Sequence, residues 1–263
     1  MRVVTLASSS KGNCILVYTE RTKILVDIGI CLEDLEKKLN ILHINPAEIS
    51  GVLNTHEHID HCKGIGAFMR KYDTPLYCHI DGVGALTRKL GKVQTHKIIT
   101  FTDIPFEVGE FEIKAFKLPH DASSCVGFTI TCETKKISIA TDFGHVTPSI
   151  VDNLLESRLV ILEANHDEQM LLANPKYSYV LKNRILGRNG HLSNNLSARV
   201  IERCALNNVK QVVLAHLSEE NNTPELCYNT ICTYLESVGI TEGVNIKIDI
   251  SPASEIGMIF YLK

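Results

Sequence analysis

The chain has 263 residues, of which 44% are apolar and 22% charged, so it can bury a large core. Its net charge of −3 excludes a protein that coats nucleic acid through an overall basic surface, but it leaves room for a locally positive site. The apolar run at the N-terminus is too short for a signal peptide, and no stretch approaches a membrane span of about 18 apolar residues. We therefore expect a cytoplasmic protein without a membrane partner, folded as one domain over residues 1–263.

The nine cysteines are odd in number, and no two of them have CxxC spacing. This pattern disfavours both a disulfide framework and a zinc knuckle built from cysteines. We expect most of them to be small buried apolar residues in a reducing compartment.

The first hundred residues predict a β meander followed by alternating helices and strands. Short runs rich in β-branched residues predict strands at residues 3–6, 14–19, 23–28, 51–55, 76–79 and 98–99. Apolar residues at helical spacing predict helices at residues 32–42, 65–72 and 82–90.

The rest of the chain contains more strands, grouped in clusters with helices between the clusters. Strands are predicted at residues 111–118, 126–132, 136–140, 159–162, 211–215, 246–250 and 257–262. Helices are predicted at residues 148–155, 168–173, 176–185, 194–206 and 224–238, with Ser193 capping the fourth and Gly239 ending the last. Such an order is typical of an α/β fold in which two sheets pack face to face with helices outside.

Four side chains that bind metals lie close together directly after the strand at residues 51–55. They are His56, His58, Asp60 and His61. An extended or turning backbone points His56 and His58 to one side. Asp60 and His61 are adjacent and do not easily reach the same ion as that pair, which favours two metals side by side.

Three further candidate ligands each follow an apolar strand: His120, Asp142 and His216. Residues at the ends of several strands gather at one edge of a sheet, which is where such folds build their sites. A nitrogen-rich set with carboxylates suits Zn²⁺, and also Mn²⁺ or Fe²⁺. The other histidines, His43, His79, His96 and His166, are expected to be ordinary core or surface residues.

This arrangement of metal-binding residues, in this order and at these intervals, resembles the metallo-β-lactamase fold superfamily. The resemblance covers nearly the whole chain and implies an αββα sandwich with a dinuclear site at one edge of the two sheets. It implies that one metal is held by His56, His58 and His120. The second metal would be held by Asp60, His61 and His216, with Asp142 bridging the two. Asp27 would steady the ligand loop through hydrogen bonds.

A second motif places His191 just before a helix, in the segment Gly-His-Leu-Ser-Asn. It is similar to the phosphodiesterase branch of the superfamily, which includes the tRNA 3′-processing ribonucleases. In that branch the histidine serves the leaving-group oxygen and a glutamate supports it; Glu163 stands in the corresponding segment. A histidine near a helix cap without a catalytic role is the alternative. The nearby helix N-terminus lowers the pKa of His191 while Glu163 raises it, and the sequence does not decide the sum.

The chain most resembles the YycJ/WalJ-like branch, which is related to the ribonuclease Z-type phosphodiesterases. The likeness rests on the segments Ser-Ser-Ser-Lys-Gly-Asn-Cys from Ser8 and Val-Asp-Ile-Gly from Val26, besides the motifs above. It implies a dinuclear metal-dependent nuclease that acts on DNA or RNA through a metal-bridging hydroxide, with Asp60, His191 and Glu163 as catalytic residues. The alternative is an ester, thioester or lactone hydrolase with the same ligands. A binding protein without activity is disfavoured because the ligand set is complete.

Two features depart from that branch or go beyond it. His145 stands where no histidine is expected, and no inserted arm for gripping tRNA is present, which disfavours tRNA maturation. Nucleases of this superfamily often dimerise, so a homodimer is compatible with the resemblance. Residues 176–188 contain basic side chains that either contact phosphates or form a solvated helix face: Lys176, Lys182, Arg184 and Arg188.

Aromatic and hydroxyl side chains supply weaker signals. Tyr177 and Tyr179 are expected to pack in the core, with base stacking as the alternative. Ser8, Ser9 and Asn13 lie on a loop near the same sheet edge, where they either contact a phosphate or are ordinary turn residues.

Overall fold

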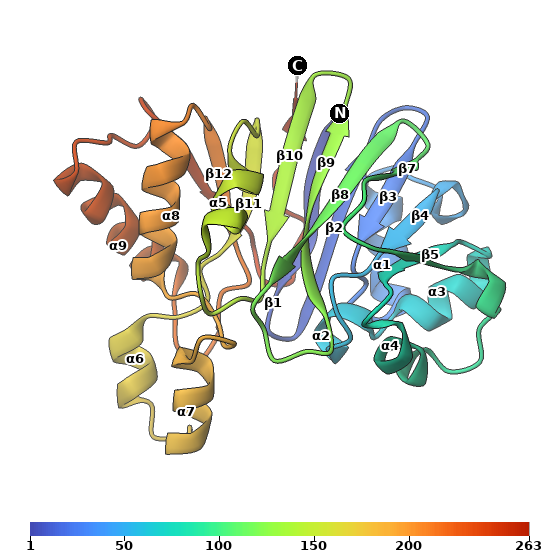
Figure 1. The fold of residues 1–263 in the computed structure, drawn as a ribbon, viewed down its shortest axis with the longest axis horizontal. Helices are drawn as coiled ribbons and strands as arrows, with labels where there is room; N and C mark the ends of the chain where they lie inside the picture. Colours follow the sequence, from blue (N-terminus) through green and yellow to red (C-terminus); the bar gives the residue numbers. More distant parts are fainter. Residues whose placement is uncertain (263) are drawn as a thin grey trace.

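The computed structural model describes residues 1–262, in which two seven-stranded sheets pack face to face between layers of helices (Figure 1). This confirms the αββα sandwich that the sequence predicts. In the first sheet the strand order is β14-β1-β2-β3-β4-β5-β6, and in the second it is β13-β12-β11-β10-β9-β8-β7. No helix of the described part of the chain is long and apolar enough to cross a membrane.

The first sheet begins as an antiparallel meander and continues as parallel strands. Its strands are β1 (Arg2–Ser9), β2 (Gly12–Tyr18), β3 (Lys23–Val26), β4 (Gly51–Leu53), β5 (Leu76–His79), β6 (Ile98–Phe101) and β14 (Phe260–Tyr261). The helical segments on its side are α1 (Leu32–Ile41), η1 (Pro46–Glu48), α2 (Ile59–Cys62), α3 (Ile65–Tyr72), α4 (Val83–Leu90) and η2 (Thr95–Lys97).

The second sheet is antiparallel from β7 to β10 and parallel from β10 to β13. Its strands are β7 (Phe106–Val108), β8 (Phe111–Leu118), β9 (Cys125–Cys132), β10 (Lys135–Ala140), β11 (Leu159–Glu163), β12 (Gln211–Ala215) and β13 (Lys247–Ile250). The helices on its side are α5 (Pro148–Leu154), α6 (Glu168–Ala173), α7 (Tyr179–Leu186), α8 (Asn194–Leu206) and α9 (Pro224–Ser237). Figure 1 shows α6 and α7 projecting beyond the body at the lower edge of the sandwich.

The strands are apolar on both faces because each sheet lies between the other sheet and a helix layer. In β1, Val3 faces the core between the sheets, whereas Val4 faces the core beneath α1, α3 and α4. In β12, Val213 faces the core between the sheets and Val212 packs beneath α8 and α9. Continuous apolar runs therefore replace the polar alternation of a half-exposed sheet.

The structure corrects several boundaries predicted from the sequence. The strand at residues 23–28 ends at Val26, because Asp27 adopts a positive φ of 59°. The helix expected from residue 176 begins at Tyr179, after Ser178 caps it by accepting a hydrogen bond from the Leu181 amide. Only Phe260–Tyr261 of the strand at residues 257–262 forms, and the short elements α2 and β7 were not predicted.

The cysteines behave largely as expected. All nine are free thiols, and all except Cys31 and Cys232 are buried.

Candidate metal centre

The candidate ligands gather at one edge of the sandwich, where strands from both sheets end. His56 follows β4 in the first sheet. In the second sheet, His120, Asp142 and His216 follow β8, β10 and β12. This edge lies at the bottom of Figure 1, near α2 and the projecting helices.

The segment from His56 to His61 turns sharply, and this brings its ligands together. His58 is the N-cap of α2, so Asp60 and His61 lie in the first turn of a helix rather than along a strand. The ring centroids of His56 lie 4.6 Å from His58 and 4.2 Å from His61. Gly29 permits this turn, because a Cβ atom there would lie 1.6 Å from the Asp60 carbonyl oxygen.

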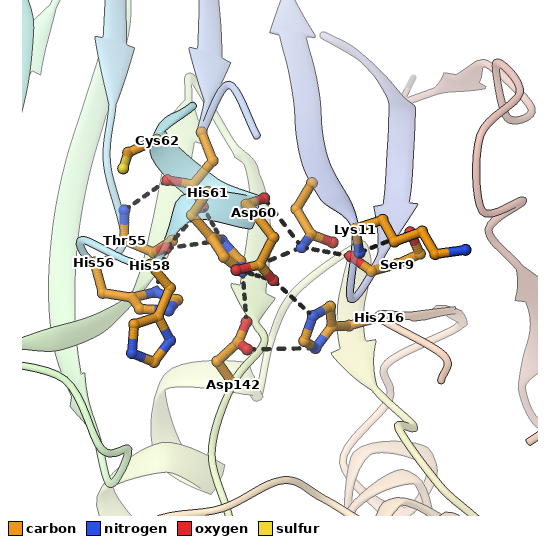
Figure 2. Close-up of polar contacts among 12 residues, drawn as sticks. Ser9, Lys11, Thr55, His56, His58, Asp60, His61, Cys62, Asp142 and His216 are labelled. Carbon is orange, nitrogen blue, oxygen red and sulfur yellow. Dashed lines mark hydrogen bonds and ion pairs between the residues drawn. The ribbon is translucent and has the colours of Figure 1, made fainter. Parts of the chain in front are cut away.

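The side chains form two adjacent groups, and within each group the ligand atoms lie within 4.8 Å of one another. One group is His56, His58 and His120; the other is Asp60, His61 and His216. Asp142 lies between them (Figure 2), with its Oδ2 3.1 Å from His61 Nε2 and its Oδ1 3.9 Å from His120 Nε2. The seven predicted ligands therefore converge, and Asp142 lies where a bridging carboxylate would.

Three buried atoms of this cluster contact at most another candidate ligand and make no hydrogen bond of good geometry within residues 1–262: His56 Nε2, His216 Nε2 and Asp142 Oδ2. Leaving such a polar atom buried and unpaired costs about 1–3 kcal/mol. Their convergence suits a cation, since imidazole nitrogens and carboxylate oxygens are ligands for Zn²⁺ and Mn²⁺. The residues present therefore fit a divalent metal.

Three residues of the site adopt the left-handed backbone conformation: Asp27, Asp142 and His216, with φ of 59°, 66° and 57°. Aspartate and histidine tolerate this region better than most non-glycine residues, yet it still stores strain. Each of the three directly follows or closely follows a strand, so the turn redirects its side chain toward the centre. Strain of this kind is concentrated at functional sites.

Asp27 fixes the orientation of His61. Its Oδ2 accepts a hydrogen bond of 2.7 Å from His61 Nδ1, which leaves His61 Nε2 facing Asp142. Asp27 also accepts bonds from Asn54 Nδ2, at 2.9 Å, and from the amide and hydroxyl of Thr55, at 2.9 and 2.7 Å. Outer contacts of this type orient metal-binding histidines. The supporting roles of Asn54 and Thr55 were not predicted, although both directly precede His56.

The backbone of His216 is held at both ends. Its amide donates to Ser8 Oγ, at 2.8 Å, and its carbonyl accepts from Asn165 Nδ2, at 2.9 Å. Ser8 is buried, so it supports His216 rather than facing a phosphate. Asn13 is also buried, and its Nδ2 lies 3.1 Å from His61 Nε2. The expectation of a loop is wrong, because Ser8 and Ser9 lie in β1 and Asn13 lies in β2.

Glu163 is a fully buried carboxylate that joins His191 to His216. Its Oε1 accepts bonds from His191 Nδ1, at 2.7 Å, and from His216 Nδ1, at 3.0 Å. Its Oε2 accepts the amides of Phe143 and Leu192, at 3.0 and 3.1 Å. Burial raises the pKa of Glu163, but the charge of His191 and the two histidine bonds outweigh it and lower this pKa to about 2. Glu163 is thus ionised near neutral pH.

His191 is the exposed member of this chain of contacts, with 22% of its side chain accessible. Because Nδ1 donates to Glu163, Nε2 is free to meet a substrate. Burial lowers the pKa of the His191 imidazole, but the Glu163 carboxylate outweighs that effect and raises it above its ordinary value. The contact with Glu163 therefore shifts His191 toward its protonated form, as expected for this glutamate.

The other histidines lie apart from the cluster. His43 and His96 are exposed, and His145 is half-buried. His79 contacts Asp81 and Asp103 at 3.4 and 3.8 Å, as an ordinary polar contact near the surface. His166 differs from the rest, because it is 1% exposed and neither ring nitrogen has a hydrogen-bond partner among the described residues.

Comparison with known proteins agrees with this geometry. Residues 22–217 match the family described as the beta-lactamase superfamily domain. The chain is 32% identical to the exodeoxyribonuclease YycJ of Bacillus anthracis, and the match covers 92% of each chain. It is 34% identical to the exodeoxyribonuclease WalJ of Streptococcus pneumoniae, over 94% of this chain and 93% of that protein.

Solved structures show the same fold at low identity. The metallo-β-lactamase fold protein YhfI of Bacillus subtilis matches with a TM-score of 0.75 and 17% identity, over 98% of each chain. The short form of human tRNase Z matches with a TM-score of 0.67 and 17% identity, over the full length of both chains. These likenesses support the architecture of the two sheets.

Proposed function

The chain belongs to the β-lactamase superfamily, and we propose that it is a metal-dependent phosphodiesterase that degrades DNA from an end. The observation that carries this proposal is the pairing of Glu163 with His191 beside the ligand cluster. Such a pair supplies a proton donor that hydrolysis of a phosphodiester needs. The names of the relatives, which are exodeoxyribonucleases, support DNA as the substrate.

Seven side chains would hold the metals. His56, His58 and His120 would bind one ion; Asp60, His61 and His216 would bind the other, with Asp142 shared between them. Two divalent ions, when bound, supply an activated water and positive charge for the phosphate oxygens. Zinc and manganese suit this donor set best, and iron also suits it.

The electrostatics of the site favour an anionic substrate. Only Asp60 and Asp142 contribute carboxylates to the ligand set, so two divalent ions would leave the centre positive although the net charge of the chain is −3. The negative charge of Glu163 is offset by its partner His191, whose protonated form it favours.

His191 would hold the proton that the leaving oxygen takes. Glu163 fixes its Nδ1 and raises its pKa, which favours the form that carries a proton at Nε2. An alkoxide is a poor leaving group, and general acid catalysis by a positioned histidine contributes about 10²–10⁴-fold. Asp60 would act as a ligand at the reacting centre, 3.5 Å from His216 Nε2.

The second candidate is a hydrolase of carboxylic esters, thioesters or lactones, which would use the same ligands. A general acid at His191 favours the phosphodiesterase, because an alkoxide needs a proton in order to leave. The leaving group of an activated ester does not need one, since the metals alone can stabilise it. A DNA substrate is compatible with the expected cytoplasmic location. The homodimer and the single domain over residues 1–263 stay predictions.

The proposal is tested with protein loaded with Mn²⁺ or Zn²⁺ and with end-labelled single- and double-stranded DNA and RNA. We expect progressive shortening of DNA that stops with a chelator and with Asp60→Ala. The Asp60→Ala protein, purified identically, controls for contaminating nuclease. Protein that contains two ions per chain but cleaves no nucleic acid would transfer the assignment to the ester hydrolase.

A further inference from the structure

A cleft of about 180 Å³ lies between His191 and α7, one of the two helices that project from the sandwich. We call α6, α7 and the loop between them, residues 168–186, the helical arm. Tyr177, Leu181 and Ile185 of the arm line the cleft, and His191 and Ser218 line it from the body. A cavity of about 150 Å³ is enough to hold benzene, so this cleft admits one aromatic ring system but not a base pair.

The arm provides an apolar wall with an aromatic face. Leu181 and Ile185 are one helical turn apart on α7, and Tyr177 lies on the segment that precedes this helix; all three side chains line the cleft. Tyr177 is half-buried, and its hydroxyl makes no hydrogen bond to a described residue. Its position corrects the expectation that it packs in the core. A nucleic-acid base is the natural partner for such a surface, since bases stack on aromatic side chains.

Arg184 stands at the mouth of the same cleft. Its Nε donates to Asp121 Oδ2, and the other Asp121 oxygen lies 3.4 Å from His120 Nε2. The terminal nitrogens of Arg184 have no hydrogen-bond partner within residues 1–262, and 59% of its side chain is exposed. Asp121 balances the charge of Arg184. It also holds the guanidinium in place next to the candidate metal ligand His120. Those two nitrogens have the geometry that phosphate oxygens accept.

We infer that this cleft is a subsite for one unpaired nucleotide of the DNA, with the base against Tyr177 and a phosphate on Arg184. This inference rests on the proposed function. Because His191 would face the leaving oxygen, the nucleotide in the cleft belongs to the part of the strand that leaves. Because a volume of about 180 Å³ has room for one base, we expect the base in the cleft to be unpaired when its bond is cleaved.

The arm offers matched controls outside the cleft. Tyr179 is 79% exposed, two positions beyond Tyr177, and does not line the cleft. Lys182 donates to the Leu172 carbonyl, at 2.6 Å, and does not line it either. Tyr179→Ala and Lys182→Ala therefore remove an aromatic ring and a positive charge from the same arm without altering the subsite.

The test compares Tyr177→Ala, Tyr177→Phe and Tyr179→Ala on a single-stranded oligonucleotide and on bis(p-nitrophenyl) phosphate, a small diester without a base. We expect Tyr177→Ala to raise KM for the oligonucleotide about 10-fold. Tyr177→Phe and Tyr179→Ala should stay within about twofold of wild type, and all three should cleave the small diester normally. Arg184→Lys should raise the same KM, whereas Lys182→Ala should not.

A measurement on the wild-type protein covers the case in which Tyr177→Ala does not fold. Substrates whose terminal nucleotide lacks a base should show the same rise in KM, and Tyr177→Ala should add no further loss on them. Equal KM values for Tyr177→Ala and Tyr179→Ala would overturn the subsite, as would a parallel loss on the small diester. Failure of the wild type to cleave any DNA would instead overturn the proposed function.

Discussion

The metal centre and the helical arm lie next to each other but are built in opposite ways. His56, Asp142 and His216 of the centre are at most 2% exposed, and buried hydrogen bonds fix their neighbours. In the arm, α7 buries none of its residues, and Tyr179 and Val180 are more than three-quarters exposed.

This difference matches the two tasks of a nuclease, which are cleavage of the phosphodiester bond and binding of the strand. The centre is preorganised for chemistry, so its side chains have little freedom to move during a reaction. The arm has few tertiary contacts, which is typical of segments that adjust to a ligand. Variants of the centre should therefore lower kcat, whereas variants of the arm should mainly change KM.

The largest separation is expected for His191→Ala, which removes the exposed member of the centre. We expect kcat on DNA to fall by at least about 100-fold, because an alkoxide would have to leave without a proton. Cleavage of bis(p-nitrophenyl) phosphate should change little, since p-nitrophenolate leaves without one. Steady-state kinetics on both substrates check this, with metal content measured to show that the ligands are intact. Equal losses on the two substrates would contradict the role given to His191.

A smaller effect is expected for Asp27→Asn, which alters the support of His61 and leaves the ligands in place. The amide cannot accept all the bonds that the Asp27 carboxylate accepts, so His61 should lose its fixed orientation. We expect metal affinity or activity to fall by about 10–100-fold. Competition with a chromogenic chelator measures the affinity, and Asp152→Asn, an exposed aspartate on α5, is the matched control. Unchanged affinity would mean that the turn at Asp27 suffices without its carboxylate.

The centre was easier to predict than the arm because its chemistry is local in the sequence. Four candidate ligands occur within the short segment from His56 to His61, and three others follow strands whose apolar runs are plain. The contacts that orient these ligands were harder to see. Asn54, Thr55 and Asn165 have no spacing that distinguishes them from ordinary turn residues, and only the folded chain brings them to Asp27 and His216.

For the helical arm, the sequence pattern predicts the helices α6 and α7 but not the burial of their side chains. A short amphipathic run does not indicate whether another surface covers its apolar face. Tyr179 was expected in the core and is almost fully exposed, while Tyr177 reaches a cleft. The strand at residues 257–262 is shorter than predicted, since only Phe260–Tyr261 pairs with β1 as a ladder, while Gly257 makes a single backbone hydrogen bond to Thr5.

His166 lies at the junction of the two regions, and the effect predicted for it is on stability. It directly precedes Asp167, which caps α6, and it pairs with Ser193, the cap of α8. Burial lowers its pKa to about 4, so the folded protein keeps it neutral where the unfolded chain, with a pKa of about 6.5, takes up a proton. Stability should therefore fall as pH decreases from about 6.5 toward 4, by about 2 kcal/mol between pH 7 and pH 5 from this residue alone.

Replacing His166 with Phe should remove that part of the pH dependence, whatever its effect on stability at pH 7. Urea unfolding of wild type and His166→Phe at pH 7 and pH 5 measures the difference, with His96→Gln, at an exposed histidine, as the control. Other groups titrate equally in both proteins, so the comparison isolates His166. If His166→Phe loses as much stability as wild type between the two pH values, His166 is protonated within the fold, and the junction contains a partner for that charge.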